Sequence, residues 1–245
     1  MPEEGSAASF RPLYSQIRSM ITRSLEAGEW RPGEAIPSEA ELAARFGVSQ
    51  GTVRKAIESL VDEHILIRRQ GKGTFVATHT ETHSSTFRFL RIRRNDGQVE
   101  IPKSELLEVR RLRMPAEIAR LLRVPSGEPA LLLRRVLIYS GVPTVYDEIT
   151  LPAALFKGLT KERFDAYKGS MYGFFETEFG VRMLRAEEQI KAVAADAVAA
   201  EVLKVGLGSP LLCVERVAFT YGDRPVEFRR GLATTRLHHY ANTLY

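Results

Sequence analysis

The chain has 245 residues, of which 44% are hydrophobic and 27% are charged, and its net charge is +5. This composition supplies a core for one or two domains and excludes a wholly disordered chain. No apolar run approaches the roughly 20 residues of a transmembrane helix, and the N-terminus lacks the basic and apolar regions of a secretion signal. The single cysteine, Cys213, excludes a disulfide framework. We therefore expect a cytoplasmic protein.

The basic excess does not mark a nucleic-acid surface by itself. Residues 1–80 contain ten basic and ten acidic side chains, whereas residues 86–125 contain ten basic and five acidic ones. Net charge therefore cannot locate a DNA-binding surface, and the local placement of basic side chains has to do so.

The first predicted element is a helix. Residues 1–10 are small and polar, and we expect a disordered tail there. Ile17, Ile21 and Leu25 then recur at helical spacing and predict a helix over residues 13–27.

Residues 38–63 fit a helix–turn–helix. Ser38 and Glu41 form a capping box at the start of one helix, and Ser49 caps the next. Because the apolar face of this last helix is expected to be buried, its polar N-terminal residues face outward. This end of the helix fits a DNA major groove, and the free backbone amides of the helix suit a phosphate. A basic, glycine-rich hairpin tip, RRQGKG, follows. The candidate DNA-binding residues lie on the caps, the helix start and this tip: Ser38, Ser49, Gln50, Gly51, Thr52, Arg54, Lys55, Arg69, Gln70, Gly71 and Lys72.

A second domain is expected after a polar segment. Residues 11–76 form the predicted DNA-binding domain, residues 77–86 an interdomain linker, and residues 87–245 the remaining domain. In that domain, helical and strand-like patterns alternate. We expect strands near 87–92 and 104–114, a helix at 115–123, a hairpin at 130–151, a helix around 170–179, a strand around 182–193, a helix at 196–203 and a hairpin at 210–233.

Part of this domain is an internal repeat. Residues 115–136 align without gaps on residues 196–217, and nine of these positions are identical, Arg135 and Arg216 among them. A helix–turn–hairpin unit used twice predicts a pseudo-twofold α+β domain. Such a domain offers a cleft between its halves for a small ligand.

Two stretches of sequence carry a resemblance to known families. Residues 12–76, with the motifs PSEAELAA, GVSQGTVRKA and RRQGKGTFV, resemble the winged helix-turn-helix domain of GntR-family transcriptional regulators. Residues 87–240, with RRVL, GVPTVYDE, GSPLLCVERV and RPVEF, resemble the UTRA effector domain of the HutC-type branch, which has a chorismate-lyase-like mixed α/β fold. The resemblance implies DNA binding through the winged helix.

The resemblance also implies an effector site between the two halves of the second domain. Matched by motif, the candidate effector-binding residues are Arg135, Asp147, Ser170, Tyr172, Glu227 and Arg229. Two arginines favour an anionic ligand, because guanidinium groups match carboxylates and phosphates. The alternative is that Arg135 forms a structural salt bridge, with Glu215 or Glu227 as partner.

Two departures from the family pattern bear on specificity. Ala40 stands where the family usually has arginine, so the operator sequence does not carry over. Ala233 stands where sugar-phosphate binders of the family often have tyrosine, which disfavours a sugar phosphate as ligand.

Other function classes have less support. Asp147 and Glu227 suit the acid–base groups of a lyase-like enzyme, but the chain has no nucleophile motif, phosphate loop or cofactor fingerprint. His79 and His83 lack a third metal ligand nearby, so we expect neither metal nor cofactor. A DNA-binding protein without a ligand is a further alternative. We predict a homodimeric transcriptional regulator, a repressor, that binds a pseudo-palindromic operator on double-stranded DNA and a small anionic metabolite, with no role at a membrane.

Overall fold

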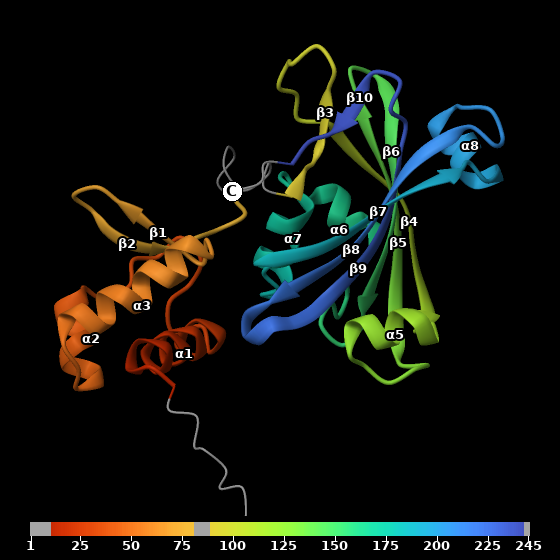
Figure 1. The fold of residues 1–245 in the computed structure, drawn as a ribbon. Coiled ribbons are helices and arrows are strands. Elements are labelled where there is room, and N and C mark those ends of the chain that lie inside the picture. Colours follow the sequence, from red (N-terminus) through yellow and green to blue (C-terminus); the bar gives the residue numbers. More distant parts are fainter. Residues whose placement is uncertain (1–10, 81–88, 243–245) are drawn as a thin grey trace, which may run out of the picture. The chain divides into compact units, whose positions relative to one another are not determined.

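The computed structural model describes residues 11–80 and 89–242, which divide into two compact units with the boundary between residues 78 and 79. Figure 1 shows a mainly helical N-terminal unit and a C-terminal unit built on a sheet. No helix in these described ranges is long and apolar enough to cross a membrane.

The N-terminal unit is the expected winged helix-turn-helix. It consists of α1 (Leu13–Glu26), α2 (Glu39–Phe46), α3 (Gln50–Asp62) and the hairpin β1 (Leu66–Arg69) and β2 (Gly73–Val76). The predicted capping box is present at Ser38 and Glu41, and Gly47 ends α2 in the left-handed conformation. The three helices share one core, in which Ile21, Leu42 and Leu60 are fully buried.

The C-terminal unit contains a six-stranded antiparallel sheet. The strands are β4 (Lys103–Arg113), β5 (Pro129–Tyr139), β6 (Val142–Pro152), β7 (Arg185–Ala194), β8 (Pro210–Thr220) and β9 (Arg224–Ala233). Their order across the sheet is β4-β5-β6-β9-β8-β7, and a short 3-10 turn, η1 (Tyr221–Asp223), joins β8 to β9. A separate two-stranded sheet pairs β3 (Ile92–Arg94) with β10 (His238–Tyr240).

This strand order confirms the internal repeat. The segment β4–α5–β5–β6 corresponds to β7–α8–β8–β9, where α5 spans Ala116–Leu122 and α8 spans Ala197–Leu203. The two halves meet at the β6–β9 pair, which lies at the centre of the sheet. Each helix packs against the other half, since the α5 cluster includes Phe228 of β9 and the α8 cluster includes Tyr146 of β6.

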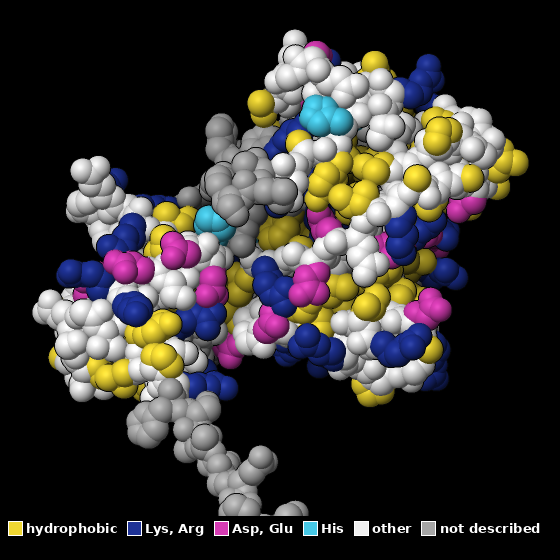
Figure 2. All heavy atoms as spheres, viewed as in Figure 1, with side chains coloured by type: hydrophobic (Ala, Val, Ile, Leu, Met, Phe, Trp, Pro, Cys, Tyr) yellow, Lys and Arg dark blue, Asp and Glu magenta, His cyan; other side chains and the backbone are white. Residues whose placement is uncertain are grey.

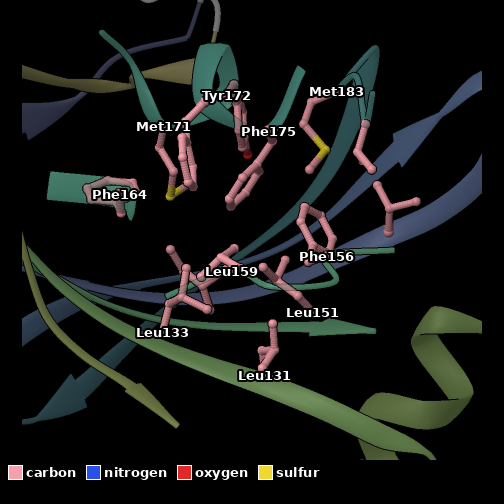
Figure 3. Close-up of a cluster of buried hydrophobic side chains, with 14 of the residues drawn as sticks. Leu131, Leu133, Leu151, Phe156, Leu159, Phe164, Met171, Tyr172, Phe175 and Met183 are labelled. Carbon is pink, nitrogen blue, oxygen red and sulfur yellow. The ribbon is translucent and has the colours of Figure 1, made fainter. Parts of the chain in front are cut away.

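The largest core lies between the sheet and two helices, α6 (Lys161–Ala166) and α7 (Met171–Phe179). Figure 3 shows side chains of α7, such as Tyr172 and Phe175, directed toward Leu133 and Leu151 of the sheet. The helix begins at Ser170, whose hydroxyl accepts from the Gly173 amide. This core fixes α7, and therefore its N-terminal residues, over the middle of the sheet.

One predicted strand in this unit lies elsewhere in the structure, and two short elements, β10 and α6, were not predicted. The strand expected near 87–92 lies at 92–94, because its position is set by pairing with β10, a strand that local pattern did not predict; residues 87 and 88 lie outside the described ranges. The helix α6 was also not predicted, although Thr160 caps it.

The segment expected to be a linker is divided between the two units. Ala77 continues the N-terminal unit, because its amide donates to the Ile65 carbonyl over 3.1 Å. His79 is buried in the C-terminal unit, where its ring nitrogen Nε2 lies 2.7 Å from the Met183 carbonyl oxygen. Residues 81–86 of the expected linker lie outside the described residues.

Candidate functional site

The first candidate surface is the N-terminal end of α3. Ser49 caps the helix, its hydroxyl accepting from the Thr52 amide over 3.2 Å and lying 2.9 Å from the Thr52 hydroxyl. Gln50 and Gly51 are exposed in the first turn, and a side chain at Gly51 would meet only the Ser49 hydroxyl, at 3.9 Å. The helix therefore presents a small, polar N-terminal end, which suits close approach to a DNA backbone.

Two basic side chains on α3 follow this end. Arg54 and Lys55 are both exposed. The Lys55 ammonium lies 4.4 Å from the centre of the Tyr14 ring, so α1 supports it. The Arg54 guanidinium donates from Nε to Glu39 over 2.8 Å, and this hydrogen bond raises the pKa of Arg54.

The wing hairpin adds a second basic group. Its tip is a tight turn in which the Lys72 amide donates to the Arg69 carbonyl over 2.9 Å. Gly71 and Gly73 have φ values of +70° and +106°, which favour glycine at both positions. Gln70 and Lys72 are exposed, and Arg69 lies over the Phe75 ring at 4.6 Å. On the face shown in Figure 2, acidic side chains lie among the basic ones of this unit, so the basic residues there do not form one continuous patch.

The second candidate site is a cavity of about 380 Å³ in the C-terminal unit. Among the described residues, its charged lining side chains are three arginines from three strands: Arg135 on β5, Arg216 on β8 and Arg229 on β9. The rest of its wall is mainly aromatic and aliphatic, with two serines: His79, Phe89, Leu90, Ile101, Pro102, Ser104, Leu137, Gly169, Ser170, Met171 and Tyr172. This volume is in the range of small-metabolite pockets.

The arginines are held in place by buried carboxylates behind them. Arg135 donates to Asp147 from Nε, over 3.0 Å, and from Nη2. Arg229 donates from Nε to Glu227 over 3.0 Å, and its Nη1 lies 3.6 Å from Asp147. Asp147 and Glu227 do not line the cavity themselves. The guanidinium groups are therefore fixed at the cavity wall while the carboxylates sit beneath them.

Tyr172 joins this network from α7. Its hydroxyl donates to Glu227 over 2.9 Å and accepts from Arg229 over 3.2 Å. Burial raises the pKa of Tyr172, which keeps its hydroxyl protonated. Burial alone would raise the pKa of Asp147, but the charges of Arg135 and Arg229 outweigh burial and lower it. For Arg229, burial opposes the charged form, but Glu227, Tyr172 and Asp147 raise its pKa.

The cavity wall presents hydrogen-bond donors from two sources. Nη1 of Arg135 has no hydrogen-bond acceptor among the described residues. The N-terminus of α7 also lies at the wall, because Ser170 and Met171 line it. Ordered donors and a helix N-terminus together suit a carboxylate or phosphate group.

The structure brings most of the predicted effector residues together. Arg135, Ser170, Tyr172 and Arg229 line the cavity, and Asp147 and Glu227 support it from behind. The carboxylate partner of Arg135 is Asp147, and not Glu215 or Glu227 as considered from the sequence. Whether these residues bind a ligand stays a prediction.

Sequence reasoning missed Arg216, Phe89 and Gly231. Arg216 is buried, and it donates to Glu188 over 2.6 Å and to the Phe89 carbonyl over 2.6 Å. Its identity with Arg135 in the internal repeat was the available signal. A methyl group at Gly231 would lie 2.9 Å from the Asp147 carboxylate, so the small residue leaves room for that group.

A winged helix followed by a sheet domain of this topology is the architecture of a class of DNA-binding transcriptional regulators. Comparison with known families agrees: residues 13–76 match the model for bacterial regulatory proteins of the gntR family, and residues 97–238 match the model for the UTRA domain. The chain therefore belongs to the GntR family and carries a UTRA domain. It is a transcriptional regulator and not an enzyme.

Relatives match over most of the chain. The HTH-type transcriptional regulator YurK of Bacillus subtilis is 30% identical over 220 residues, which cover 89% of each chain. The HTH-type transcriptional repressor NagR of the same organism is 28% identical, with 90% of each chain covered. A crystal structure of a Bordetella bronchiseptica ligand-binding domain, described as GntR-family, is 48% identical, covers 64% of this chain and 98% of its own, and has a TM-score of 0.61.

Proposed function

We propose that this chain is a repressor whose operator binding is modulated by a small anionic metabolite bound in the C-terminal unit. The proposal is supported by the cavity, to whose wall Arg135, Arg216 and Arg229 contribute guanidinium groups. The repressor role is supported by relatives such as NagR, which is named a transcriptional repressor. The site of action is the cytoplasm, where bacterial DNA lies.

DNA binding is assigned to the start of α3 and the wing. We propose that Gln50, Gly51 and Arg54 face the major groove, and that Lys72 at the wing tip contacts the phosphate backbone. One such head reads only a few base pairs, which is too little to define a site in a genome. We therefore propose a homodimer on a pseudo-palindromic operator, and sedimentation of the full chain at tens of micromolar tests the dimer.

Replacing Lys72 with alanine should weaken binding to every DNA sequence alike. A lysine that meets only phosphate contributes through counterion release, so its loss should reduce the slope of log affinity against log salt by about 1. Gln50→Ala is the contrasting variant, which should lose discrimination at one base pair by roughly 1–3 kcal/mol. A titration at several salt concentrations measures both effects. An unchanged slope for Lys72→Ala contradicts its phosphate contact.

The ligand can regulate only if it prefers one state of the protein. An anion that binds more tightly to the DNA-free protein than to the DNA-bound protein lowers operator occupancy, and an anion with the opposite preference raises it. The size of the change is set by the difference between the two affinities.

A thermal-shift screen tests the effector assignment. Carboxylate and phosphate metabolites are added to the full-length protein, and a binder should raise the melting temperature by mass action. The matched control for each hit is its neutral amide or ester, which keeps the shape and removes the charge. A neutral analogue that raises the melting temperature as much as the acid would contradict recognition by the arginines.

A further inference from the structure

Glu39 connects three elements of the winged helix. It is the first residue of α2, and its two carboxylate oxygens accept from arginines on two other elements. Arg54 of α3 donates to one oxygen over 2.8 Å, and Arg68 of β1 donates to the other over 3.1 Å. The Glu39 side chain is 22% exposed, whereas those of Arg54 and Arg68 are 56% and 45% exposed. The carboxylate is thus partly enclosed beneath two accessible guanidinium groups.

The hydrogen bond from Arg54 to Glu39 uses Nε of the guanidinium group and leaves both Nη groups available. Only Nε donates to Glu39, and neither Nη group has an acceptor among the described residues of the chain. A guanine offers O6 and N7 to two donor groups of one arginine, which is the commonest specific contact in the major groove. A carboxylate that holds Nε therefore orients this arginine and restricts its rotation before DNA arrives.

The two ion pairs of Glu39 contribute little to the stability of the fold. Ion pairs between exposed side chains contribute about 0–1 kcal/mol to folding. A carboxylate next to the recognition helix also repels the phosphates of every DNA sequence. Glu39 therefore disfavours binding to DNA of any sequence. A neutral residue at this position would not have this effect.

We propose that Glu39 is a specificity-determining positioning residue, which orients Arg54 for base recognition and lowers affinity for non-specific DNA. The inference rests on the proposed DNA-binding role of α3. It assigns to α2 a part in sequence discrimination that the candidate residues on α3 and the wing do not include.

The test compares the full-length protein with its Glu39→Gln variant. A site selected from random duplexes by the wild type serves as the operator, and a scrambled duplex serves as non-specific DNA. Glu39→Gln keeps the shape and removes the charge. It should bind the scrambled duplex more tightly and lose about tenfold in the ratio of operator to non-specific affinity, which is the size of one good arginine–guanine contact.

Two further variants separate positioning from charge alone. Glu58→Gln removes a carboxylate that lies 3.8 Å from Arg68 and makes no hydrogen bond to Arg54. It should raise both affinities together and leave the ratio unchanged. In an Arg54→Ala background, Glu39→Gln should no longer change the ratio, because the residue that it positions is missing.

The outcomes distinguish this inference from the proposed function. Suppose that the wild type selects an operator. The positioning role is overturned, while DNA binding stands, if Glu39→Gln leaves the ratio of operator to non-specific affinity unchanged. It is also overturned if Glu39→Gln lowers that ratio as much in the Arg54→Ala background as in the wild type. If the wild type shows no sequence preference, the assignment of α3 to base recognition fails, and this inference fails with it.

Discussion

Replacing Arg135 with alanine should lower the free energy of unfolding of the C-terminal unit by about 3–5 kcal/mol. The guanidinium and its partner Asp147 are both buried, with side chains 7% and 4% exposed. Removal of the cation leaves a carboxylate in the sheet, and Arg229, at 3.6 Å, compensates its charge only in part. We therefore expect a loss near the lower end of that range.

Two spectroscopic signals can assign this loss to one unit. The single tryptophan, Trp30, is buried in the N-terminal unit, so its fluorescence reports the winged helix. Far-ultraviolet circular dichroism reports the secondary structure of both units, so a transition that it shows and that Trp30 fluorescence does not share belongs to the C-terminal unit. In denaturant titrations of Arg135→Ala, the circular dichroism transition should move to lower denaturant, and the Trp30 transition should stay.

Matched variants show whether the buried pair is the cause. Arg134 directly precedes Arg135 on the same strand, but its side chain is 31% exposed and pairs with Glu148 and Glu108. Arg134→Ala should cost no more than about 1 kcal/mol. The double variant Arg135→Ala, Asp147→Ala should be more stable than Arg135→Ala alone, because no uncompensated charge remains. An equally unstable double variant would show that packing, and not charge, dominates.

The double variant also tests the role of Arg135 in ligand binding. The single substitution combines a folding defect with loss of a cavity cation, so it cannot separate them. The double variant keeps Arg229 and Arg216 at the cavity wall and removes only one guanidinium and the carboxylate beneath it. We expect it to fold, to bind operator, and to show a smaller thermal shift with an anionic ligand.

The DNA-binding unit was predictable because its signals are local. The capping box at Ser38 and Glu41, the cap at Ser49 and the glycines of the wing each act within a few residues. Such signals determine where a helix or turn begins without information from the rest of the chain. What the sequence did not indicate is Glu39, because its two partners lie 15 and 29 residues away.

In the C-terminal unit, the internal repeat was predictable from the sequence, but the pairing of individual side chains was not. The alignment of residues 115–136 on residues 196–217 implied two equivalent halves, and the sheet order bears this out. It did not indicate that Asp147 is the partner of Arg135, because that depends on the register of β5 against β6. Short elements such as β10 depend on a distant partner strand, so local pattern could not reveal them.

Replacing Phe175 with alanine should be the most damaging change in the core beneath the cavity wall. The ring is fully buried between α7 and the sheet and packs edge-on against Phe156, with centroids 4.8 Å apart. Truncation of a buried phenylalanine costs about 3–5 kcal/mol, because it removes buried apolar surface and leaves a void. Tyr172 lies one turn earlier on the same helix, so a shift of α7 into the void also moves a cavity wall residue.

The stability of Phe175→Ala is measured in the same denaturant titrations, by circular dichroism and by Trp30 fluorescence. The circular dichroism transition should move to lower denaturant while Trp30 fluorescence keeps its midpoint. Phe175→Leu retains most of the buried volume and should cost clearly less, and Thr177→Ala, at an exposed position of the same helix, should stay within about 0.5 kcal/mol of wild type. If the alanine variant matched Thr177→Ala in stability, α7 would not be held to the sheet by this core, and another contact would have to fix Tyr172 at the cavity wall.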